Sequence, residues 1–429
     1  GATRRRLRTA VTAVLAASAM LWLSGAPAGA WSSGDGAVAV FGGTGSDVGY
    51  SVAVDSSGNV YTTGKFKDTV DFDPGAGTAN LTSNGSEDVF VSKLDSSGNY
   101  VWAKSFGGTG SDVGYSVAVD SSGNVYTTGD YGQSTVDFDP GAGTANLGLG
   151  GGMFVSKLDS SGNYVWAKTF VGFPVRGNSI AVDSSGNVYT TGYFRSTVDF
   201  DPGAGTANLT STGSYDVFVS KLDSAGNYVW AKSFGGTGTD EGNSVAVDSS
   251  GNVYTTGKFL FNGDFDPGAG TANLTSAGVS MDVFVSKLDS SGDYVWAKSF
   301  GGTGTDEGNS VAVDSSGNVY TTGQFVLTVD FDPGAGTAEL TADNTDVFVS
   351  KLDSSGNYVW ARNFGGTSFD AGYSVAVDSS GNVYTTGGLR FTADFDPGAG
   401  TANLTSNGVF DVFVSKLDSS GNYVWARNF

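Results

Sequence analysis

The sequence predicts an all-β fold, a six-bladed β-propeller with four antiparallel strands per blade. Three observations lead to this prediction. The segment DSSGNVYTTG recurs six times, starting at residues 55, 120, 183, 248, 314 and 378. Each repeat holds four short runs rich in Val, Tyr, Phe, Thr and Trp, without helical periodicity. The end repeats resemble the middle ones, which favours a closed ring over a linear stack with polar caps.

Four strands are expected in the first repeat. They are residues 50–54, 59–66, 88–94 and 100–106. The first pair and the last pair are each joined by Asp-Ser-Ser-Gly, where Asp can bond its own backbone and Gly permits a left-handed residue. These two short turns indicate two hairpins per repeat, and a long loop connects the second strand to the third.

Each four-stranded sheet has apolar residues on both of its faces. Trp102 and Phe106 share one face of the last strand, whereas Val101 and Ala103 lie on the other. A sheet of this kind needs a neighbour on each side, and radial stacking supplies both. We therefore expect one propeller domain over residues 42–429. Its repeats start near residues 48, 113, 176, 241, 307 and 371.

The N-terminal residues predict export. Residues 1–30 hold four arginines, a short apolar run over residues 10–23 and a small-residue site at Ala28-Gly29-Ala30, which is typical of a signal peptide. The run is too short to span a membrane. Residues 31–41 end in AVAVF before GGTGSD and resemble the end of a fourth strand. We expect a secreted or cell-surface bacterial protein with no membrane span after cleavage.

Composition excludes several function classes. Without residues 1–30 the chain has 18 basic and 43 acidic residues, a net charge near −25, and such a surface repels nucleic acid. The chain has no Cys, so no disulfide stabilises it. It has no His, which excludes a Ser-His-Asp triad and histidine metal ligands.

The repeat has the form SVAVDSSGNVYTTG, then VDFDPGAGTANLTS, then DVFVSKLDSSGNYVWAKSFGG. It resembles the SBBP β-propeller repeat of bacterial exported and cell-surface proteins. The resemblance covers residues 38–429 and implies the fold, but it implies no shared activity.

Antiparallel order places the linkers and the long loops at one end of the propeller and the short turns at the other. Residues that vary between repeats lie in the linkers and long loops, so that end is the expected binding face. We expect a monomeric, non-catalytic binding scaffold that presents six near-identical acidic loops to a protein or glycan ligand.

The acidic loops share the segment DFDPGAGTA, whose two aspartates point to the same side of an extended chain. One hypothesis is a turn, in which each carboxylate accepts nearby backbone N–H groups. The other is a calcium site in each blade, calcium being the only cofactor considered. The candidate ligands are Asp71, Asp73, Asp137, Asp139, Asp199, Asp201, Asp264, Asp266, Asp330, Asp332, Asp394 and Asp396.

Two further function classes stay open. A calcium-dependent adhesion or carbohydrate-binding propeller would sharpen the scaffold hypothesis. A hydrolase or lyase would need groups in different environments, and near-identical repeats give every blade the same groups. Arg176 and Arg195, in the third repeat, break this symmetry, but no nucleophile and base accompany them. We therefore do not expect an enzyme.

Overall fold

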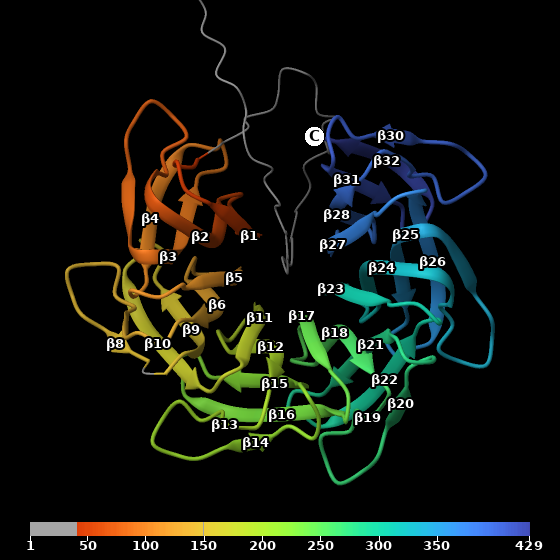
Figure 1. Cartoon of the computed structure of the whole chain (residues 1–429), viewed down its shortest axis with the longest axis horizontal. Coiled ribbons are helices and arrows are strands. Elements are labelled where there is room, and N and C mark those ends of the chain that lie inside the picture. The colour runs from red at the N-terminus through yellow and green to blue at the C-terminus, as the bar shows by residue number, and fades with distance from the viewer. Residues whose placement is uncertain (1–40, 149) are drawn as a thin grey trace, which may run out of the picture.

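The computed structural model describes residues 41–148 and 150–429, and all the regular structure in these residues is β-strand. Six four-stranded antiparallel sheets are arranged around a common axis, so the six-bladed propeller prediction is confirmed (Figure 1). The expected signal peptide, residues 1–30, and residues 31–40 of the N-terminal segment lie outside the described residues.

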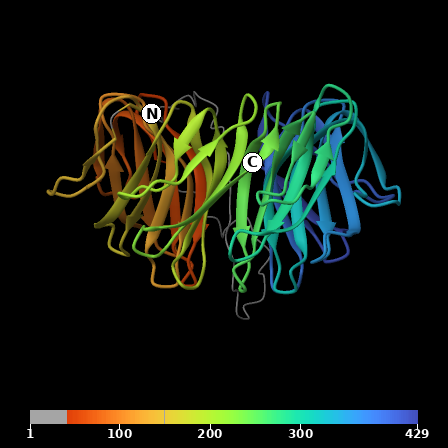
Figure 2. The same cartoon turned by 90° about the horizontal axis from the view of Figure 1, so that it is seen from below.

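Each blade has its first strand nearest the axis and its fourth strand at the circumference (Figure 1). Seen from the side, the strands run roughly along the axis (Figure 2). The first strands are β1 (Val48–Val54), β5 (Val113–Val119), β11 (Val175–Val182), β17 (Glu241–Val247), β23 (Glu307–Val313) and β27 (Ala371–Val377). The second strands are β2 (Val60–Asp71), β6 (Val125–Tyr131), β12 (Val188–Phe194), β18 (Val253–Leu260), β24 (Val319–Asp330) and β28 (Val383–Leu389). The third strands are β3 (Asn80–Leu94), β9 (Gly152–Leu158), β15 (Asp216–Leu222), β21 (Met281–Leu288), β25 (Glu339–Leu352) and β31 (Asp411–Leu417). The fourth strands are β4 (Tyr100–Phe106), β10 (Tyr164–Val171), β16 (Tyr228–Gly236), β22 (Tyr294–Phe300), β26 (Tyr358–Gly366) and β32 (Tyr423–Asn428). Blades 1 to 6 take one strand from each series in this order.

The Asp-Ser-Ser-Gly turns form as the sequence predicts. In the turn between β1 and β2, the Asp55 carboxylate accepts the N–H groups of Ser57 and Asn59, both at 2.9 Å. Gly58 has a φ of 82°, a left-handed conformation in which a side chain would be strained. The same glycine conformation recurs in the equivalent turns of the other blades. Local bonding therefore fixes the register of each hairpin without help from distant contacts.

The core of the propeller lies between blades. In the cluster that joins blades 1 and 2, Tyr61, Val89 and Val91 of blade 1 pack with Val117 and Phe154 of blade 2. All five side chains are 0% exposed. Equivalent clusters join each later blade to the next, as far as blade 6. Each of these sheets therefore buries its apolar side chains against its neighbours.

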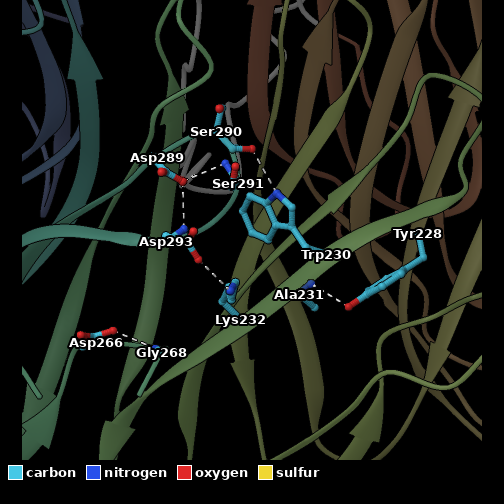
Figure 3. A network of polar contacts seen from close by, with 10 residues as sticks. All are labelled: Tyr228, Trp230, Ala231, Lys232, Asp266, Gly268, Asp289, Ser290, Ser291 and Asp293. Carbon is cyan, nitrogen blue, oxygen red and sulfur yellow. Dashed lines mark hydrogen bonds and ion pairs between the residues drawn. The ribbon is translucent and has the colours of Figure 1, made fainter. Parts of the chain in front are cut away.

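In blades 1 to 5 a tryptophan on the fourth strand bonds the blade to the next one. Trp230 Nε1 donates to the Ser290 carbonyl at 3.3 Å, and Lys232 reaches Asp293 of the same turn at 3.4 Å (Figure 3). The bond recurs from Trp102, Trp166, Trp296 and Trp360. Because the acceptor is a turn whose own shape is fixed by Asp289, the bond sets the position of one blade against the next.

The long connection between the second and third strands is not an irregular loop, and in this respect the sequence interpretation needs correction. In blade 1, β2 and β3 continue past the sheet and pair with each other from Thr69 with Thr82 to Asp71 with Asn80. In blade 5, β24 and β25 do the same. Elsewhere separate strands form the hairpin: β7 (Val136–Asp137) with β8 (Asn146–Leu147), β13 (Thr197–Asp199) with β14 (Asn208–Thr210), β19 (Asn262–Asp264) with β20 (Asn273–Thr275), and β29 (Thr392–Asp394) with β30 (Asn403–Thr405).

In blades 2 to 6 the outer hairpin packs on the end of the preceding blade. In blade 4, Asp264 of β19 pairs with Gly235 of β16. Phe265 at the hairpin tip is 0% exposed, and its ring lies 5.3 Å from Phe234 of blade 3 and 5.0 Å from Phe284 of its own blade. The sequence missed this pairing because alternating polar and apolar residues such as ANLTS look the same in a loop and in a two-stranded ribbon. The hairpins consequently lie along the circumference (Figure 1).

The expected closed ring is wrong for the described residues. First strands of consecutive blades pack on one another from β1 round to β27. Within the described residues β27 and β1 do not share this packing, and they stand on either side of the opening at the top of Figure 1. The contact angle between blades is fixed by the repeated interface, and six blades at that angle leave a sector open.

None of the described residues belongs to a helix that is long and apolar enough to cross a membrane.

We expect Phe265→Ala to lower the free energy of unfolding by about 3 to 5 kcal/mol, because the change empties a fully buried ring site between two blades. Urea denaturation followed by tryptophan fluorescence would measure the loss. Val279→Ala is a control because Val279 is 83% exposed, and we expect a change within about 0.5 kcal/mol. Equal effects of the two substitutions would show that the outer hairpin does not contribute to the core.

Candidate functional site

The predicted aspartate pairs lie at the tips of the outer hairpins. In blade 1, Asp71 Oδ1 accepts the N–H groups of Asp73 at 3.1 Å and of Ala79 at 2.8 Å. Asp73 Oδ1 accepts the N–H of Gly75 at 2.7 Å. A side chain at Gly77 would collide with the Asp73 carboxylate, which explains a glycine at this position. The structure therefore contains the hydrogen bonds of the turn hypothesis.

The same bonds recur in the other five blades. In each pair the first aspartate accepts two backbone N–H groups and the second aspartate accepts one. The pairs are Asp137 and Asp139, Asp199 and Asp201, Asp264 and Asp266, Asp330 and Asp332, and Asp394 and Asp396. No group of three acidic side chains gathers around a possible metal position anywhere in residues 41–148 and 150–429. Calcium binding at these pairs stays a prediction.

The tips are not displayed on the end of the propeller where the sequence analysis placed them. Asp396, Pro397 and Gly398 of the blade 6 hairpin share a small cavity with Arg362 of β26 and with Asn422 in the turn before β32. In blade 4, Asp266 and Gly268 likewise lie beside the outermost strand of blade 3 (Figure 3). The acidic loops leave the linker end and bend down the circumference, because their phenylalanines anchor them between neighbouring blades.

A second set of carboxylates forms pairs between blades, which the sequence analysis missed. Each pair joins the aspartate that begins the DVFVSKL segment of a third strand to an aspartate in the next linker. The pairs are Asp88 with Asp112, Asp216 with Asp240, Asp282 with Asp306, and Asp346 with Asp370. All eight residues are at most 5% exposed. The structure thus brings Asp88 to Asp112 of the next repeat.

Backbone N–H groups hold the linker member of each pair. Asp306 accepts from Gly302 at 2.8 Å and from Val326 at 3.1 Å, so its carboxylate fastens the linker to the second strand. Asp282 accepts from Ala277 at 2.8 Å, and its Oδ1 has no partner among the described residues. Burial, with the neighbouring charge of Asp306, raises the pKa of Asp282 to about 7. The pKa of Asp306 is raised to about 6 by its own burial.

The junction of blades 2 and 3 lacks both members of the pair. Gly152 occupies the third-strand position and Val175 the linker position, as the strand registers show. This joint loss is the signal in the sequence that could have revealed the pairing. Burying one isolated carboxylate costs more free energy than burying a pair that shares a proton, and more than having no acidic residue at the junction. The two acids are therefore present together or absent together.

The axial mouth at the linker end carries side chains that differ from blade to blade. Tyr50 and Tyr115 lie with ring centroids 5.4 Å apart, and the Arg176 guanidinium stacks 3.7 Å from the Tyr115 centroid. The Tyr115 hydroxyl donates to Asp130 at 3.2 Å. Burial opposes the charge of Arg176, but Tyr115 and Asp130 outweigh it and raise its pKa. Blades 1 to 3 thus place two aromatic rings, a guanidinium and a carboxylate close together.

Ion pairs continue this mouth around the ring. Lys65 of β2 bonds Glu87 of β3 at 2.8 Å. Lys258 of β18 lies between Glu241 at 3.5 Å and Glu307 of the next blade at 3.0 Å. These residues are half-buried, and they vary where the rest of the repeat does not. The charged side chains near the mouth therefore differ from one blade to another.

Arg176 and Arg195, the two residues that break the symmetry of the repeats, have different surroundings. Arg176 is engaged by Tyr115, as described above. Arg195 is exposed, and its backbone N–H donates to the Pro174 carbonyl at 3.0 Å.

The opposite end has an axial cavity of about 920 Å³. Its lining repeats the same Val-Asp-Ser-Ser segment from several blades, including Val247, Asp248 and Ser249. The Asp248 carboxylate is already bound by Asn252 and by the Tyr254 hydroxyl, at 2.7 and 3.0 Å. The cavity therefore presents a uniform surface with its carboxylates engaged.

Comparison with known proteins supports the fold. Five segments match the SBBP family, described as a beta-propeller repeat: residues 40–65, 101–130, 175–193, 229–258 and 295–324. The chain is 24% identical over 468 residues to "Uncharacterized WD repeat-containing protein L264" of Acanthamoeba polyphaga mimivirus, which covers 88% of this chain and 33% of that protein. It is 29% identical over 176 residues to "Regulatory protein FlaEY" of Caulobacter vibrioides, which covers 39% of this chain and 18% of that protein.

The chain thus spans about a third or less of these two relatives. Among solved structures it is similar to the extracellular domain of the one-component system BT4673 from B. thetaiotaomicron. The sequence identity is 11% and the TM-score is 0.21, over 89% of this chain and 59% of that one.

The buried carboxyl pairs predict that stability falls as pH rises. Because the pKa of Asp282 is about 7 in the folded chain against an ordinary 3.8, the folded state binds a proton between these values that the unfolded state has lost. We therefore expect the melting temperature to fall from pH 5 to pH 7.5. Asp282→Asn should raise it at pH 7.5 and leave it unchanged near pH 4.

Differential scanning calorimetry across this pH range would measure the effect. The control is Asp293→Asn, which removes a surface carboxylate whose side chain is 71% exposed. A lower melting temperature of Asp282→Asn at both pH values would contradict the assignment of a buried, proton-sharing pair.

The hairpin aspartates give a separate prediction about calcium. If the turn bonds account for Asp266, the melting temperature is the same in 2 mM calcium and in chelator, since no ligand favours the folded state. Asp266→Ala should then lower the stability by about 1 kcal/mol in both solutions. A calcium-dependent rise that Asp266→Ala reduces would instead establish the metal site.

Proposed function

The chain is a β-propeller built of SBBP repeats, and from this premise we propose that it is a secreted or cell-surface binding scaffold without catalytic activity. The stack of Tyr50, Tyr115 and Arg176 at the axial mouth is the observation that carries the proposal. It joins aromatic surface to a guanidinium beside an acid, and residues of these types dominate the affinity of protein interfaces.

The distribution of variation supports the same surface. The residue that follows each TTG segment varies between blades, and it pairs with a residue at the start of the first strand. At the opposite end each blade repeats nearly the same turn, with its donors and acceptors satisfied. A ligand that is specific for this protein finds distinguishing groups at the linker end, where a protein or a glycan can reach them.

The carboxylates with raised pKa do not argue for an enzyme. Asp282 and Asp306 have pKa values near neutrality, as acid and base groups of hydrolases do. They are 3% and 0% exposed, however, and are covered by the inter-blade linker. A substrate cannot reach them in this arrangement, so their role is to hold blades together.

Export is part of the proposal and rests on the signal-like residues 1–30 and on the family resemblance. The calcium-dependent adhesion alternative rests on the hairpin aspartates alone.

A glycan array probed with the full chain, and a protein display library probed in parallel, test this proposal. We expect binding to one of them, and Tyr115→Ala or Arg176→Ala should weaken it by at least about tenfold. Ser249→Ala, at the exposed turn of the other end, is the matched control and should leave binding unchanged. Loss of binding with Ser249→Ala alone would place the ligand at the wrong end for this account. A hydrolytic activity that Arg176→Ala abolishes would contradict the absence of catalysis.

A further inference from the structure

We propose that the open sector between blades 6 and 1 is the seat of a seventh SBBP blade, whose fourth strand ends at Phe41 and Gly42. The proposal is independent of the ligand. It rests on two incomplete interfaces, a strand end that is already in place and two half-formed carboxyl pairs.

The side of blade 6 that faces the open sector lacks the cover its equivalents have. Val347 and Val349 of blade 5 are both 0% exposed, whereas their equivalents Val412 and Val414 are half-buried. Trp425 is half-buried too, although the tryptophan at this position in the other five blades is at most 8% exposed. The described residues form five inter-blade clusters, and none of them covers this face.

The facing side of blade 1 is incomplete in the complementary way. Val52 and Val60 are half-buried, whereas Val117 and Val125 of blade 2 are at most 1% exposed. The apolar cluster on this side of blade 1 contains residues of blade 1 and Phe41, but no other blade contributes to it. Both surfaces are thus made for the interface that recurs five times elsewhere in the ring.

Phe41 and Gly42 already occupy the place of a fourth-strand end. Gly42 bridges Asp71 of the blade 1 hairpin, as Gly107 at the end of blade 1 bridges Asp137 of blade 2. The Phe41 ring lies 5.2 Å from Phe72 and 5.8 Å from Phe90. The corresponding distances from Phe106 in blade 1, to Phe138 and Phe154 of blade 2, are 5.3 and 5.4 Å.

Two incomplete carboxyl pairs at the open sector also indicate a missing blade. Asp411 stands at the third-strand position of blade 6 and Asp47 at the linker position of blade 1. Each is half-buried, whereas the members of complete pairs are buried. A further SBBP repeat would bring a linker aspartate to Asp411 and a third-strand aspartate to Asp47.

A single further blade would cover the open faces of blade 6 and of blade 1 at once. This favours a blade over a second copy of the chain as the occupant of the open sector. A blade has one face that fits blade 6 and another that fits blade 1. A second copy of the chain would use blade 1 of one molecule on blade 6 of another, a head-to-tail contact that propagates into open assemblies. It would also have to displace or accommodate Phe41, which already lies in the seat.

The absence of Cys in the chain permits a direct test. Val414→Cys reports on the open face and Val349→Cys is the matched buried control. In the full chain we expect maleimide to label Cys at 414 at least about tenfold faster than Cys at 349, since labelling at 349 requires local opening. Slow labelling at both positions would overturn the proposal, because the sector would already be filled.

The occupant is tested by extending the chain after Phe429 with a copy of residues 365–418, which carries only the first three strands of a blade. We expect labelling at 414 to slow to the rate at 349, with a monomer in analytical ultracentrifugation. Phe41→Ala should restore fast labelling in the extended chain, and a Gly-Ser extension of equal length should give no protection. Unprotected 414 in the extended chain would overturn the proposal. Labelling at 414 that slows as the concentration of the unextended chain rises would also overturn the proposal, since it would identify a second copy as the occupant.

Discussion

The packing of one blade against the next is the constraint on which the rest of the structure depends. A single sheet of this repeat has apolar side chains on both faces, and neither face can be left in water at a favourable free energy. Between consecutive blades the interface is fixed by the bond from a tryptophan to the following turn and by the phenylalanines of the outer hairpin. Because this geometry repeats, it fixes the angle between blades, the axial mouth and the size of the open sector.

Aspartate serves three different purposes in each repeat. In the short turns Asp95 accepts the N–H groups of Ser97 and Asn99, and hydrogen bonds from Asn99 lower its pKa. In the outer hairpins Asp71 and Asp73 cap a turn around Pro74. Between blades Asp88 lies buried against Asp112, and burial raises the pKa of Asp88 to about 6. The same side chain thus favours folding when charged in one place and when protonated in another.

These opposite shifts bear on the strongly acidic composition. Lowered pKa values, as at Asp95, make stability fall only when the pH drops below the ordinary carboxyl range. Raised values, as at Asp346, where it is about 7, make stability fall as the pH rises toward neutrality. The chain therefore keeps a charged surface while it removes charge from its blade interfaces.

Local regularities of the sequence predicted most of the fold. The repeat length, the strand composition and the Asp-Ser-Ser-Gly turns identify the blades, because each depends on neighbouring residues only. The outer hairpins were missed because their strands are two or three residues long outside blades 1 and 5, and because they depend on Phe265 and its equivalents meeting the preceding blade. The open sector was missed for a similar reason, since no residue type encodes the angle between two sheets.

The candidate site shows the same division. The carboxyl-rich segment DFDPGAGTA was a candidate metal site because it repeats in every blade. Its carboxylates accept backbone N–H groups, as those of a turn do. The mouth around Arg176 and Tyr115 was visible only as variation, because its residues come from three blades. Asp282 and Asp306 lie in different repeats of the sequence. Their pairing could not be predicted because only the arrangement of blades around the axis brings them together.

Hydrogen–deuterium exchange of the full chain, resolved by blade, is the most direct measurement of the central claim that neighbouring blades stabilise each other. If so, amides of β28 and β31 in blade 6 and of β1 in blade 1 exchange before those of β12 and β15 in blade 3, which has a neighbour on each side. Uniform protection of all six blades would contradict the account, since it would mean that no blade lacks a partner.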